Sequence, residues 1–498
     1  MAKELRSASV AAPGFFGLNL QESSVTLAAG FALQADNCII DKYGRLGSRK
    51  GWDYQTTGSD GVNLKGSHEF VDINGVRTVI SWNDTTFYTG VTTLTTPTDT
   101  STAFTSANFD AATLNDKAFF CQRGQLIRQY DPTTNTFSDV AGSPKANTCL
   151  SAYGRLWVAD TDTDKTIVYW SNLLDGTDFA TGSSGSIDLS AVLVKGNDEI
   201  VALGAHNGRL IIFCKDNIVV YDSQGDILDP VTMSLVEVIT DVGCIARDSV
   251  QNIGVDILFL SNTGLLSLGR VLQEKSQPMR DLSRNVRDDL INILNQSDVN
   301  VVRSSYSIKD AFYLLYFPEY KRLYCFDTRS PLQDGSARVT LWDSQTHSNM
   351  FIHNDELYCN NTNGIAKYTG YKDYGQAYVM KYYTNYFDFD DPTSLKILKR
   401  ITATVIGGNR QAFTLKAGFD YFNRYRSFPA VLEDLANYEW GIAEWGIAEY
   451  STGTLVDQVR APMGGDGVVV QMGLEADIEG QPLSIQRLDI YVKQGKTL

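Results

Sequence analysis

Residues 207–222 read NGRLIIFCKDNIVVYD and hold two short apolar runs, at 210–213 and 218–221, each preceded by a polar turn. Tight β-hairpins need turn residues that accept positive φ, and Asn-Gly and Asp-Asn both do. This stretch therefore predicts an antiparallel hairpin with two buried strands.

The same pattern recurs along the chain. Copies begin near Asn74-Gly75, Asn115-Asp116, Tyr153-Gly154 and Asn207-Gly208, and weaker ones occupy residues 255–264, 311–327 and 354–368. The turns lie roughly 40–55 residues apart, an interval typical of propeller blades with four strands each. We predict an all-β protein whose β-propeller has six or seven blades; a generic meander or two β-sandwiches would also fit the pattern.

Two other regions flank or interrupt the blades. Residues 1–54 form an N-terminal segment that leads into the propeller, residues 55–375 form the propeller, and residues 376–498 form a C-terminal β-sandwich-like domain. Inside the propeller, residues 276–297 place Leu282, Val286, Leu290, Ile293 and Leu294 at helical spacing. We expect an inserted amphipathic helix that packs against the blades, with a partner-docking helix as the alternative.

Composition limits the class of protein. The 498 residues carry 43 Lys plus Arg and 58 Asp plus Glu, a net charge of −15, which disfavours ordinary DNA binding. No apolar run is long enough for a membrane-spanning helix, and the N-terminus lacks the apolar core of a secretory signal. The seven cysteines stand far apart, so we expect free thiols in a chain synthesised in a reducing cytoplasm.

Charge is segregated within the C-terminal domain. Residues 392–430 hold seven bases and one acid, whereas residues 431–480 hold ten acids and one base. The acidic block contains the tandem repeat WGIAE, at 440–444 and 445–449. Opposite blocks could associate head to tail in a ring, although solvated faces are the simpler interpretation of both. The candidate subunit or partner contacts are Trp440, Glu444, Trp445 and Glu449, because Trp is a preferred interface anchor; a buried extended loop or strand would use the same residues.

Motifs for catalysis are missing from the sequence. There is no nucleophile elbow, and Ser67 follows Gly66 where a phosphate-binding loop requires Lys. The aspartates at 160, 162 and 164 begin like a calcium loop, but Lys165 stands where Gly is needed. His347 and His353 have no nearby Cys for a zinc site. We therefore predict no catalytic residues, no metal, no cofactor and no enzymatic activity.

The N-terminal segment carries a family resemblance. The runs PGFFGLNLQ at 13–21, ADN at 35–37, GRL at 44–46 and RKGW at 49–52 resemble the opening of tail hub (nozzle) proteins of short-tailed bacteriophages. YGRL at 153–156, the hairpin at 209–221, residues 254–260 and the helix after Lys275 are similar to that family's blades. The similarity spans most of residues 13–370, while about 125 C-terminal residues match only in being β-rich.

The resemblance implies a function and partners, without assigning a role to any single residue. Such a chain would be a virion tail protein that forms a ring, expected to be a homohexamer, below the portal and its adaptor proteins. The ring would also contact tail fibres or spikes, close the tail, and conduct double-stranded DNA during genome ejection. The acidic composition favours a lumen wall that repels phosphates. The alternative is a carbohydrate-binding or carbohydrate-cleaving propeller that serves as a phage receptor-binding component.

Overall fold

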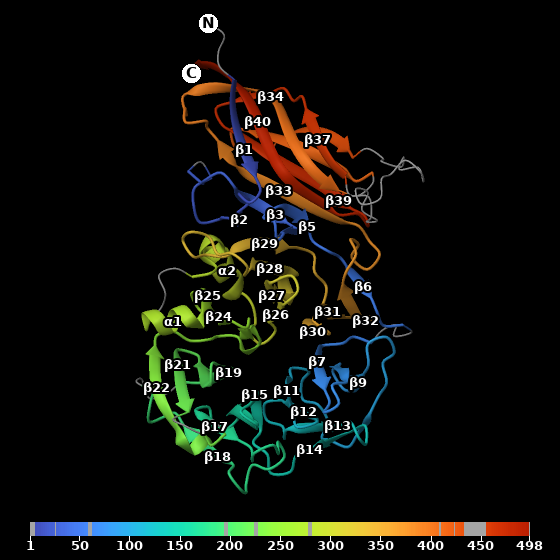
Figure 1. Cartoon of the computed structure of the whole chain (residues 1–498), viewed down its shortest axis with the longest axis vertical. Coiled ribbons are helices and arrows are strands. Elements are labelled where there is room, and N and C mark those ends of the chain that lie inside the picture. The colour runs from blue at the N-terminus through green and yellow to red at the C-terminus, as the bar shows by residue number, and fades with distance from the viewer. Residues whose placement is uncertain are drawn as a thin grey trace, which may run out of the picture.

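A propeller and a β-sandwich lie end to end along the long axis of the molecule (Figure 1). The computed structural model describes residues 5–24, 26–57, 62–193, 198–223, 228–276, 281–407, 410–422, 424–432 and 455–497. Both ends of the chain lie on the sandwich (Figure 1). The predicted all-β fold, with a β-propeller and a C-terminal β domain, is confirmed.

Seven successive sheets of the described residues surround a central channel, and the innermost strand of each, which is β11 in the second sheet and the first strand in the others, contacts the innermost strand or adjoining turn of the next. These sheets are the blades. Their strands are β7 (Gly66–Val71), β8 (Arg77–Trp82) and β9 (Phe87–Thr89); β10 (Thr98–Asp99), β11 (Asp110–Leu114), β12 (Lys117–Cys121), β13 (Arg128–Asp131) and β14 (Thr136–Asp139); β15 (Ala146–Ala152), β16 (Arg155–Thr161), β17 (Ile167–Trp170) and β18 (Gly185–Asp188); β19 (Ile200–His206), β20 (Arg209–Cys214), β21 (Asn217–Ser223) and β22 (Met233–Thr240); β23 (Gln251–Asn252), β24 (Ile257–Ser261) and β25 (Gly264–Ser267); β26 (Arg303–Ser307), β27 (Phe312–Phe317), β28 (Arg322–Asp327) and β29 (Arg338–Trp342); and β30 (Asn349–His353), β31 (Glu356–Asn361) and β32 (Gly364–Tyr368) with β6 (Trp52–Tyr54).

The hairpin predicted at residues 207–222 forms in the expected register. β20 and β21 pair antiparallel, with Phe213 opposite Ile218. Asn207 and Gly208 adopt φ of 50° and 78°, the left-handed region that the turn requires. The turn dipeptide thus determines where the strand reverses, and the apolar runs fill the blade core.

The ring of blades is closed by the N-terminal segment. β6 pairs antiparallel with β32, with Trp52 opposite Tyr368, and so supplies the outer strand of the last blade. The chain then runs directly into β7 of the first blade. Residues more than 300 positions apart in the chain therefore complete one sheet, and this pairing holds the ring shut.

The sandwich also draws on both ends of the chain. One sheet contains β34, β37, β38 and β40 together with N-terminal β1, β4 and β5, and the other contains β33, β39, β35 and β36. Their bounds are β1 (Leu5–Ala11), β2 (Gly17–Leu18), β3 (Phe31–Asp36), β4 (Cys38–Ile40), β5 (Leu46–Ser48), β33 (Tyr378–Phe387), β34 (Ser394–Gly407), β35 (Ala412–Phe419), β36 (Arg426–Val431), β37 (Leu455–Ala461), β38 (Asp466–Gly467), β39 (Val470–Ile478) and β40 (Leu483–Thr497).

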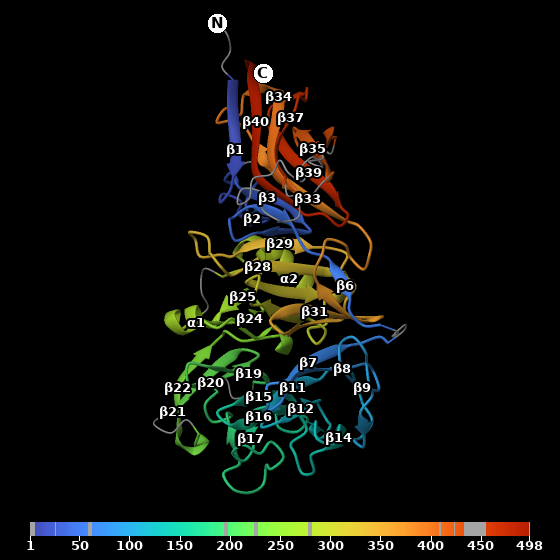
Figure 2. The ribbon, with the colours of Figure 1, turned by 45° about the vertical axis from the view of Figure 1, so that its right-hand side comes forward.

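The propeller and sandwich share a continuous sheet. β2 and β3 lie between β29 of the sixth blade and β33 of the sandwich, which gives a ten-stranded sheet (Figure 2). Gly17 adopts φ of 83°, and a Cβ there would lie 2.4 Å from the Val339 carbonyl oxygen, so this close approach requires glycine. The N-terminal residues thus do more than lead into the propeller, because they also complete the second domain.

The inserted helical segment is shorter than the sequence pattern predicts. Helix α2 spans Arg287–Leu294 and buries Leu290, Ile293 and Leu294, as expected for the apolar face. Before it, Arg284–Val286 form the 3₁₀ turn η3, and Leu282 N–H donates to the Leu265 carbonyl of β25 at 3.1 Å, so these described residues are not part of the helix. The remaining helical elements are α1 (Leu268–Glu274) and the short 3₁₀ turns η1 (Pro230–Thr232), η2 (Arg247–Ser249), η3 (Arg284–Val286) and η4 (Pro318–Tyr320).

A buried histidine lies in the core between the last two blades. His347 is 2% exposed, and its ring centroid lies 4.2 Å from that of Tyr316 and 5.3 Å from that of Trp52. Neither ring nitrogen has a hydrogen-bond partner. Burial lowers the pKa of His347 from 6.5 to about 3, so the folded chain holds a neutral imidazole in mildly acidic solution.

Replacing this histidine should flatten the response to mild acid. Below pH 6.5 the unfolded chain gains a proton at His347 and the folded chain does not, so stability falls as pH is lowered towards 3. By pH 5 this one group accounts for roughly 2 kcal/mol. We expect His347→Phe to lose less stability than the parent chain between pH 7 and 5 in urea unfolding followed by circular dichroism. Equal losses in the two proteins would contradict the prediction.

Candidate functional site

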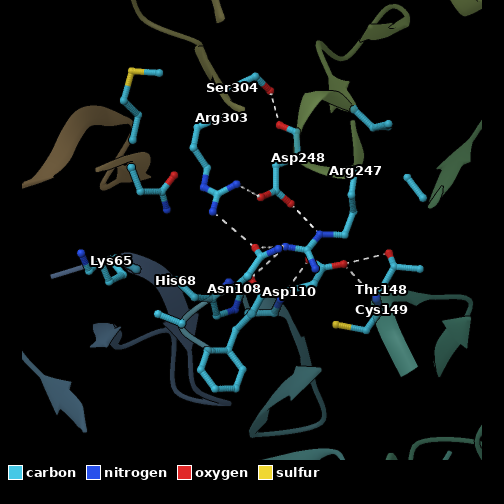
Figure 3. Close-up of a pocket in the computed structure, with 18 of the residues that line it drawn as sticks. Lys65, His68, Asn108, Asp110, Thr148, Cys149, Arg247, Asp248, Arg303 and Ser304 are labelled. Carbon is cyan, nitrogen blue, oxygen red and sulfur yellow. Dashed lines mark hydrogen bonds and ion pairs between the residues drawn. The ribbon is translucent and has the colours of Figure 1, made fainter. Parts of the chain in front are cut away.

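The propeller channel contains a cavity of about 310 Å³ with a polar lining. Its walls come from first strands of several blades and from the connections that precede them (Figure 3). Figure 3 labels Lys65, His68, Asn108, Asp110, Thr148, Cys149, Arg247, Asp248, Arg303 and Ser304. This is the part of the described structure where charged side chains from distant sequence positions converge.

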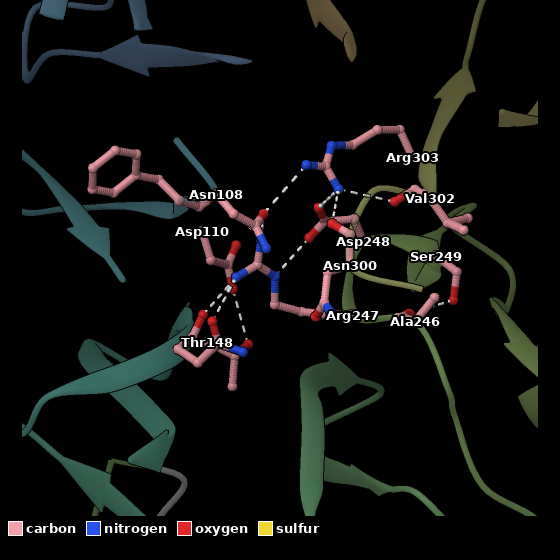
Figure 4. Close-up of polar contacts among 12 residues, drawn as sticks. Asn108, Asp110, Thr148, Ala246, Arg247, Asp248, Ser249, Asn300, Val302 and Arg303 are labelled. Carbon is pink, nitrogen blue, oxygen red and sulfur yellow. Dashed lines mark hydrogen bonds and ion pairs between the residues drawn. The ribbon is translucent and has the colours of Figure 1, made fainter. Parts of the chain in front are cut away.

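Arg247, in η2, reaches across the channel to other blades (Figure 4). Its Nη1 donates to the Asn147 carbonyl at 2.7 Å, and its Nη2 donates to Asn108 Oδ1 at 2.7 Å and to the Phe109 carbonyl at 3.3 Å. Its Nε donates to Asp248 Oδ1 at 2.6 Å. All three guanidinium nitrogens are therefore engaged, and they link η2 to the starts of the second and third blades.

Arg303 completes the cluster from the sixth blade. Its Nη1 lies 2.8 Å from Asp248 Oδ2 and donates to the Asn300 carbonyl at 2.7 Å, while its Nη2 donates to Asn108 Oδ1 at 3.3 Å. Asp248 thus lies between two guanidinium groups, and its own backbone carbonyl accepts from Ser304 Oγ at 2.6 Å. Asn108 is shared by both arginines, which ties blades on opposite sides of the channel together.

Protonation states follow from this arrangement. Burial alone would raise the pKa of Asp248, but Arg247 and Arg303 outweigh it and lower that pKa below its ordinary value. Burial lowers the pKa of Arg303, with Asp248 opposing the shift. Burial likewise opposes the charge on Arg247, yet Asp248 and Asp110 raise its pKa above the usual value. Near neutral pH the cluster is a set of charged, mutually neutralising groups.

Asp110 behaves differently from Asp248. Its Oδ2 accepts from Thr148 Oγ1 and from the Cys149 N–H, both at 2.9 Å, which joins the second blade to the third. Burial raises the pKa of Asp110, although Arg247 acts against the increase. A raised carboxyl pKa in a cavity is a common feature of functional sites, but buried structural networks produce the same shift. Here the carboxylate is occupied by groups that hold neighbouring blades together.

Removing Arg247 should loosen the propeller. Arg247→Met would leave the Asn147 carbonyl without its donor, leave Asn108 Oδ1 with Arg303 alone and take one cation from Asp248, at a cost of roughly 3 kcal/mol. The matched control is Arg209→Met, which removes a half-exposed ion pair with Asp222 at 3.1 Å and should cost less than about 1 kcal/mol. Urea unfolding of both variants compares the two costs; similar values would show that the channel cluster is no brace.

A second buried cation fastens the propeller to the sandwich. Arg49 is fully buried, and its Nη1 donates to Asp373 Oδ1 at 2.8 Å while Nη2 pairs with Asp373 Oδ2 at 2.5 Å. Its guanidinium carbon lies 4.1 Å from the ring centroid of Tyr378, the first residue of β33. Burial opposes the charge, but Asp373 outweighs burial and raises the pKa of Arg49.

Asn37 extends this junction to both domains. Its Oδ1 accepts from Arg49 Nε at 2.9 Å, and its Nδ2 donates to the Val379 carbonyl at 2.8 Å and to Asp343 Oδ1. Trp342 Nε1 donates to the Cys38 carbonyl at 3.0 Å. The sequence runs ADN and RKGW therefore meet in one hydrogen-bonded cluster between β29 and β33.

Neutralising the partner of Arg49 should destabilise the whole junction. Asp373→Asn keeps the side-chain shape but leaves a fully buried cation without its counter-charge, which costs about 3–5 kcal/mol. Glu356→Gln provides the control, because its ion pairs with Lys309 and Lys367 lie at the surface and contribute little. Chemical unfolding measures both; a cost below about 1 kcal/mol for Asp373→Asn would contradict the assigned role.

The structure does not describe the predicted contact residues. Trp440, Glu444, Trp445 and Glu449 lie outside the described residues, so their role stays a prediction. Part of the charge segregation does have a structural explanation. Lys416 of the basic block pairs with Glu475 of the acidic block, on the adjacent strands β35 and β39. Lys396 is 2% exposed and donates to the Asp391 carbonyl. These bases therefore serve the chain's own packing.

The weaker motifs of the sequence are used in packing as well. Asp160 is 1% exposed and accepts from Lys165 Nζ and from Asn147 Nδ2, both at 2.8 Å, and it also pairs with Arg123. His353 Nδ1 lies 2.8 Å from Glu69 Oε1, apart from the His347 core. Within the described ranges no group of three or more His, Cys, Asp or Glu side chains is placed to hold a metal, and no helix is long and apolar enough to cross a membrane.

The channel cluster could not be found from the sequence. Asp110 and Arg303 each open a first strand, and Arg247 and Asp248 lie in a connection, so nothing in their spacing joins them. They meet only because the ring closes. A charged residue at the start of an inner strand is the one local feature that would have drawn attention to them.

Comparisons with known proteins give similarities of fold alone. No protein-family model matches the chain, and no curated protein matches it. PorZ of Porphyromonas gingivalis is similar over 76% of this chain and 46% of PorZ, at 11% identity and a TM-score of 0.35. The WD40 domain of Toxoplasma gondii coronin is similar over 74% of this chain and 86% of that domain, at 9% identity and a TM-score of 0.38. BamB of Moraxella catarrhalis is similar over 73% of this chain and 98% of BamB, at 9% identity and a TM-score of 0.35. This chain thus spans less than half of PorZ, and similarities this low say nothing about what it binds.

Proposed function

We propose that this chain is a structural, non-enzymatic virion protein, a tail hub or nozzle subunit of a short-tailed bacteriophage. In this proposal several copies, six in number, form a ring in the tail below the portal-adaptor proteins and beside fibres or spikes. The ring closes the tail and conducts double-stranded DNA during ejection. The chain would be made in the host cytoplasm and act in the virion.

The observation that carries the proposal is where the family-like residues lie. The runs that resemble hub proteins, at 13–21, 35–37, 44–46 and 49–52, build the junction between propeller and sandwich. Phe15 packs edge-on to Tyr382 of the sandwich at 5.9 Å, Gly17 joins β29, and Arg49 binds Asp373. A fixed junction of this kind suits a subunit that must transmit force between neighbours. The residues that resemble hub proteins therefore lie in the segment that, in this proposal, transmits force.

The contacts in the propeller channel favour a structural role for the channel over passage of DNA or catalysis within it. Arg247 and Arg303 cross it and bind Asn108, and each ionised group in the cluster is paired with another or with a neighbouring blade. A DNA duplex needs a passage formed between subunits, because these side chains cross the channel of each propeller. In the proposal, therefore, the lumen is the axis of the ring, lined by faces of several copies.

The carbohydrate-binding alternative gains no support from the channel. Sugar binding commonly uses exposed aromatic rings, whereas Trp82 and Phe109, which line the cavity, are 4% and 6% exposed. They pack on each other at 5.7 Å between ring centroids. Their rings are part of the blade core and offer no stacking surface to a sugar in the channel.

Purified virions provide the test. Mass spectrometry of particles from the phage that encodes the chain should find it in a fixed copy number, six for each tail. Antibody raised against the purified chain should label the tail tip in electron micrographs. As a control, host-surface polysaccharide should neither bind the purified chain nor be shortened by it. Absence from virions, or cleavage of polysaccharide, would contradict the proposal.

A further inference from the structure

The two faces of the propeller differ in the residues at their loop tips. Within each blade, the loops joining first to second strands and third to fourth strands lie on the same side, which we call the tip face. Contacts confirm this continuity between blades. Ile73 N–H donates to Asp116 Oδ1 at 2.9 Å, Asn115 Nδ2 donates to the Leu174 carbonyl at 2.8 Å, and Leu174 N–H donates to the Gly154 carbonyl at 2.7 Å.

The tip face exposes aliphatic side chains. A Cβ on Gly154 would lie within 4 Å of three leucines, which shows that these come together over the third and fourth blades. Further tips continue the pattern around the ring. The exposed residues are Ile73 (77%), Val76 (58%), Leu173 (39%), Leu174 (55%), Leu228 (44%), Val231 (77%), Val255 (85%) and Ile308 (61%).

The opposite face lacks this property. Its turns join second to third strands and include residues 83–86, 122–125, 215–216 and 362–363, all polar in sequence apart from Gly124. Among the described residues of these turns, the one exposed large apolar side chain is Tyr320, at 42%. Clustered exposed apolar side chains on one face indicate a protein contact, whereas scattered single ones do not.

One loop shows that the apolar tips are held rigidly. Leu174 adopts φ of 55°, a conformation that a leucine rarely takes. The Asn115 side chain donates to its carbonyl and its N–H donates to the Gly154 carbonyl, while more than half of its surface is exposed. Strain of this kind persists only where the surroundings impose it.

The tip face is also acidic over the first four blades. Their tip loops, as read in the sequence, contain no Lys or Arg but contain Asp72, Asp116, Asp175, Asp178 and Asp229. Residues 62–240 as a whole carry 21 acids and 11 bases, which accounts for most of the net charge of −15. The bases nearest the tips begin the following strands, and two of them are paired: Arg77 with Glu69 at 3.2 Å and Arg209 with Asp222 at 3.1 Å.

The sandwich offers a complementary surface. The outward residues of β37, β34, β40 and β1 include the exposed bases Arg400, Arg460, Arg487 and Lys493, which we call the basic sheet face. Its acids are Asp489, which binds Arg487 Nε at 2.7 Å, and Asp466 at one end. Arg400 lies over the ring of Tyr491 at 4.3 Å, and Ser7, Ser9 and Thr404 surround these bases. The surface is therefore net positive in an acidic protein.

We infer that the tip face of one copy of this chain docks on the basic sheet face of the next. An apolar and acidic surface fits a partner surface of opposite charge. The sandwich domain of this same chain supplies such a surface. Contact between two different faces is heterologous and closes into a ring when the rotation permits. The inference rests on the proposed ring and assigns its subunit contact.

Complementation between two variants tests this contact. Ile73→Ser with Val231→Ser damages the tip face alone, and Arg400→Glu with Arg460→Glu damages the basic sheet face alone. All four side chains are exposed, so the variants should fold like the parent chain, as judged by circular dichroism. Sedimentation velocity of the full-length chain should show ring-sized species for the parent and at least tenfold weaker association for each variant. An equimolar mixture of the two variants should form dimers and nothing larger, because one intact contact remains.

Two controls separate the contact from general surface effects. Tyr320→Ser, on the opposite face, should leave association unchanged. The triple variant Asp72→Asn, Asp116→Asn and Asp175→Asn keeps the side-chain oxygens that cap these loops but removes charge, so it should weaken association in dilute salt and reduce its dependence on salt.

Each other outcome would overturn the inference. A parent chain that remains monomeric at its highest soluble concentration would do so, and so would a ring that is indifferent to both variants. Binding of a short DNA duplex that needs Arg400 and Arg460, with no association between copies, would assign the basic sheet face to nucleic acid instead. The proposed function is judged separately, because presence of the chain in virions does not depend on which faces meet.

Discussion

The buried guanidinium of Arg49 is the interaction on which the two-domain architecture depends. A fully buried cation is tolerable only with a counter-charge and complete hydrogen bonding, and Asp373, Asn37 and the Lys50 carbonyl supply both. These partners come from the N-terminal segment and from the connection after the last blade. Arg49 therefore gains its counter-charge only when the N-terminal segment meets the connection after the last blade, and Tyr378 of β33 packs on the same guanidinium, which couples the two domains energetically.

Buried arginines also link separate structural units in the propeller channel. Arg247 and Arg303 reach acceptors on other blades, so the ring is held from its centre as well as at its closing strand. A propeller braced in this way resists opening, and its channel is crossed by its own side chains. This arrangement suits a rigid scaffold whose contact surfaces lie on its outside, where the exposed tip face and the basic sheet face are.

Local sequence patterns predicted what is local in the fold. Asn207-Gly208 determined a turn through its backbone freedom, and the apolar runs around it became paired strands. The helical spacing of residues 276–297 was correct for Leu290, Ile293 and Leu294, but the helix starts only at Arg287, after the 3₁₀ turn η3 and after Leu282, which bonds to β25. Sequence patterns could not predict the junction or the channel cluster, because Arg49 meets Asp373 and Arg247 meets Asn108 only when the ring closes. The tandem WGIAE repeat lies outside the described residues, so its role stays a prediction.

The closing strand also imposes an order on synthesis. β6 ends at Tyr54 and its partner β32 ends at Tyr368, so on a ribosome the first strand of the pair exists long before the second. At typical elongation rates the interval is roughly 15–60 s. β1 must wait still longer for β40. Throughout that time the nascent chain carries unpaired strand edges at its N-terminus, a state that recruits chaperones or finds wrong partners. Each copy thus reaches its final fold only after β40 has been synthesised, which delays any assembly into larger particles until that strand has paired with β1.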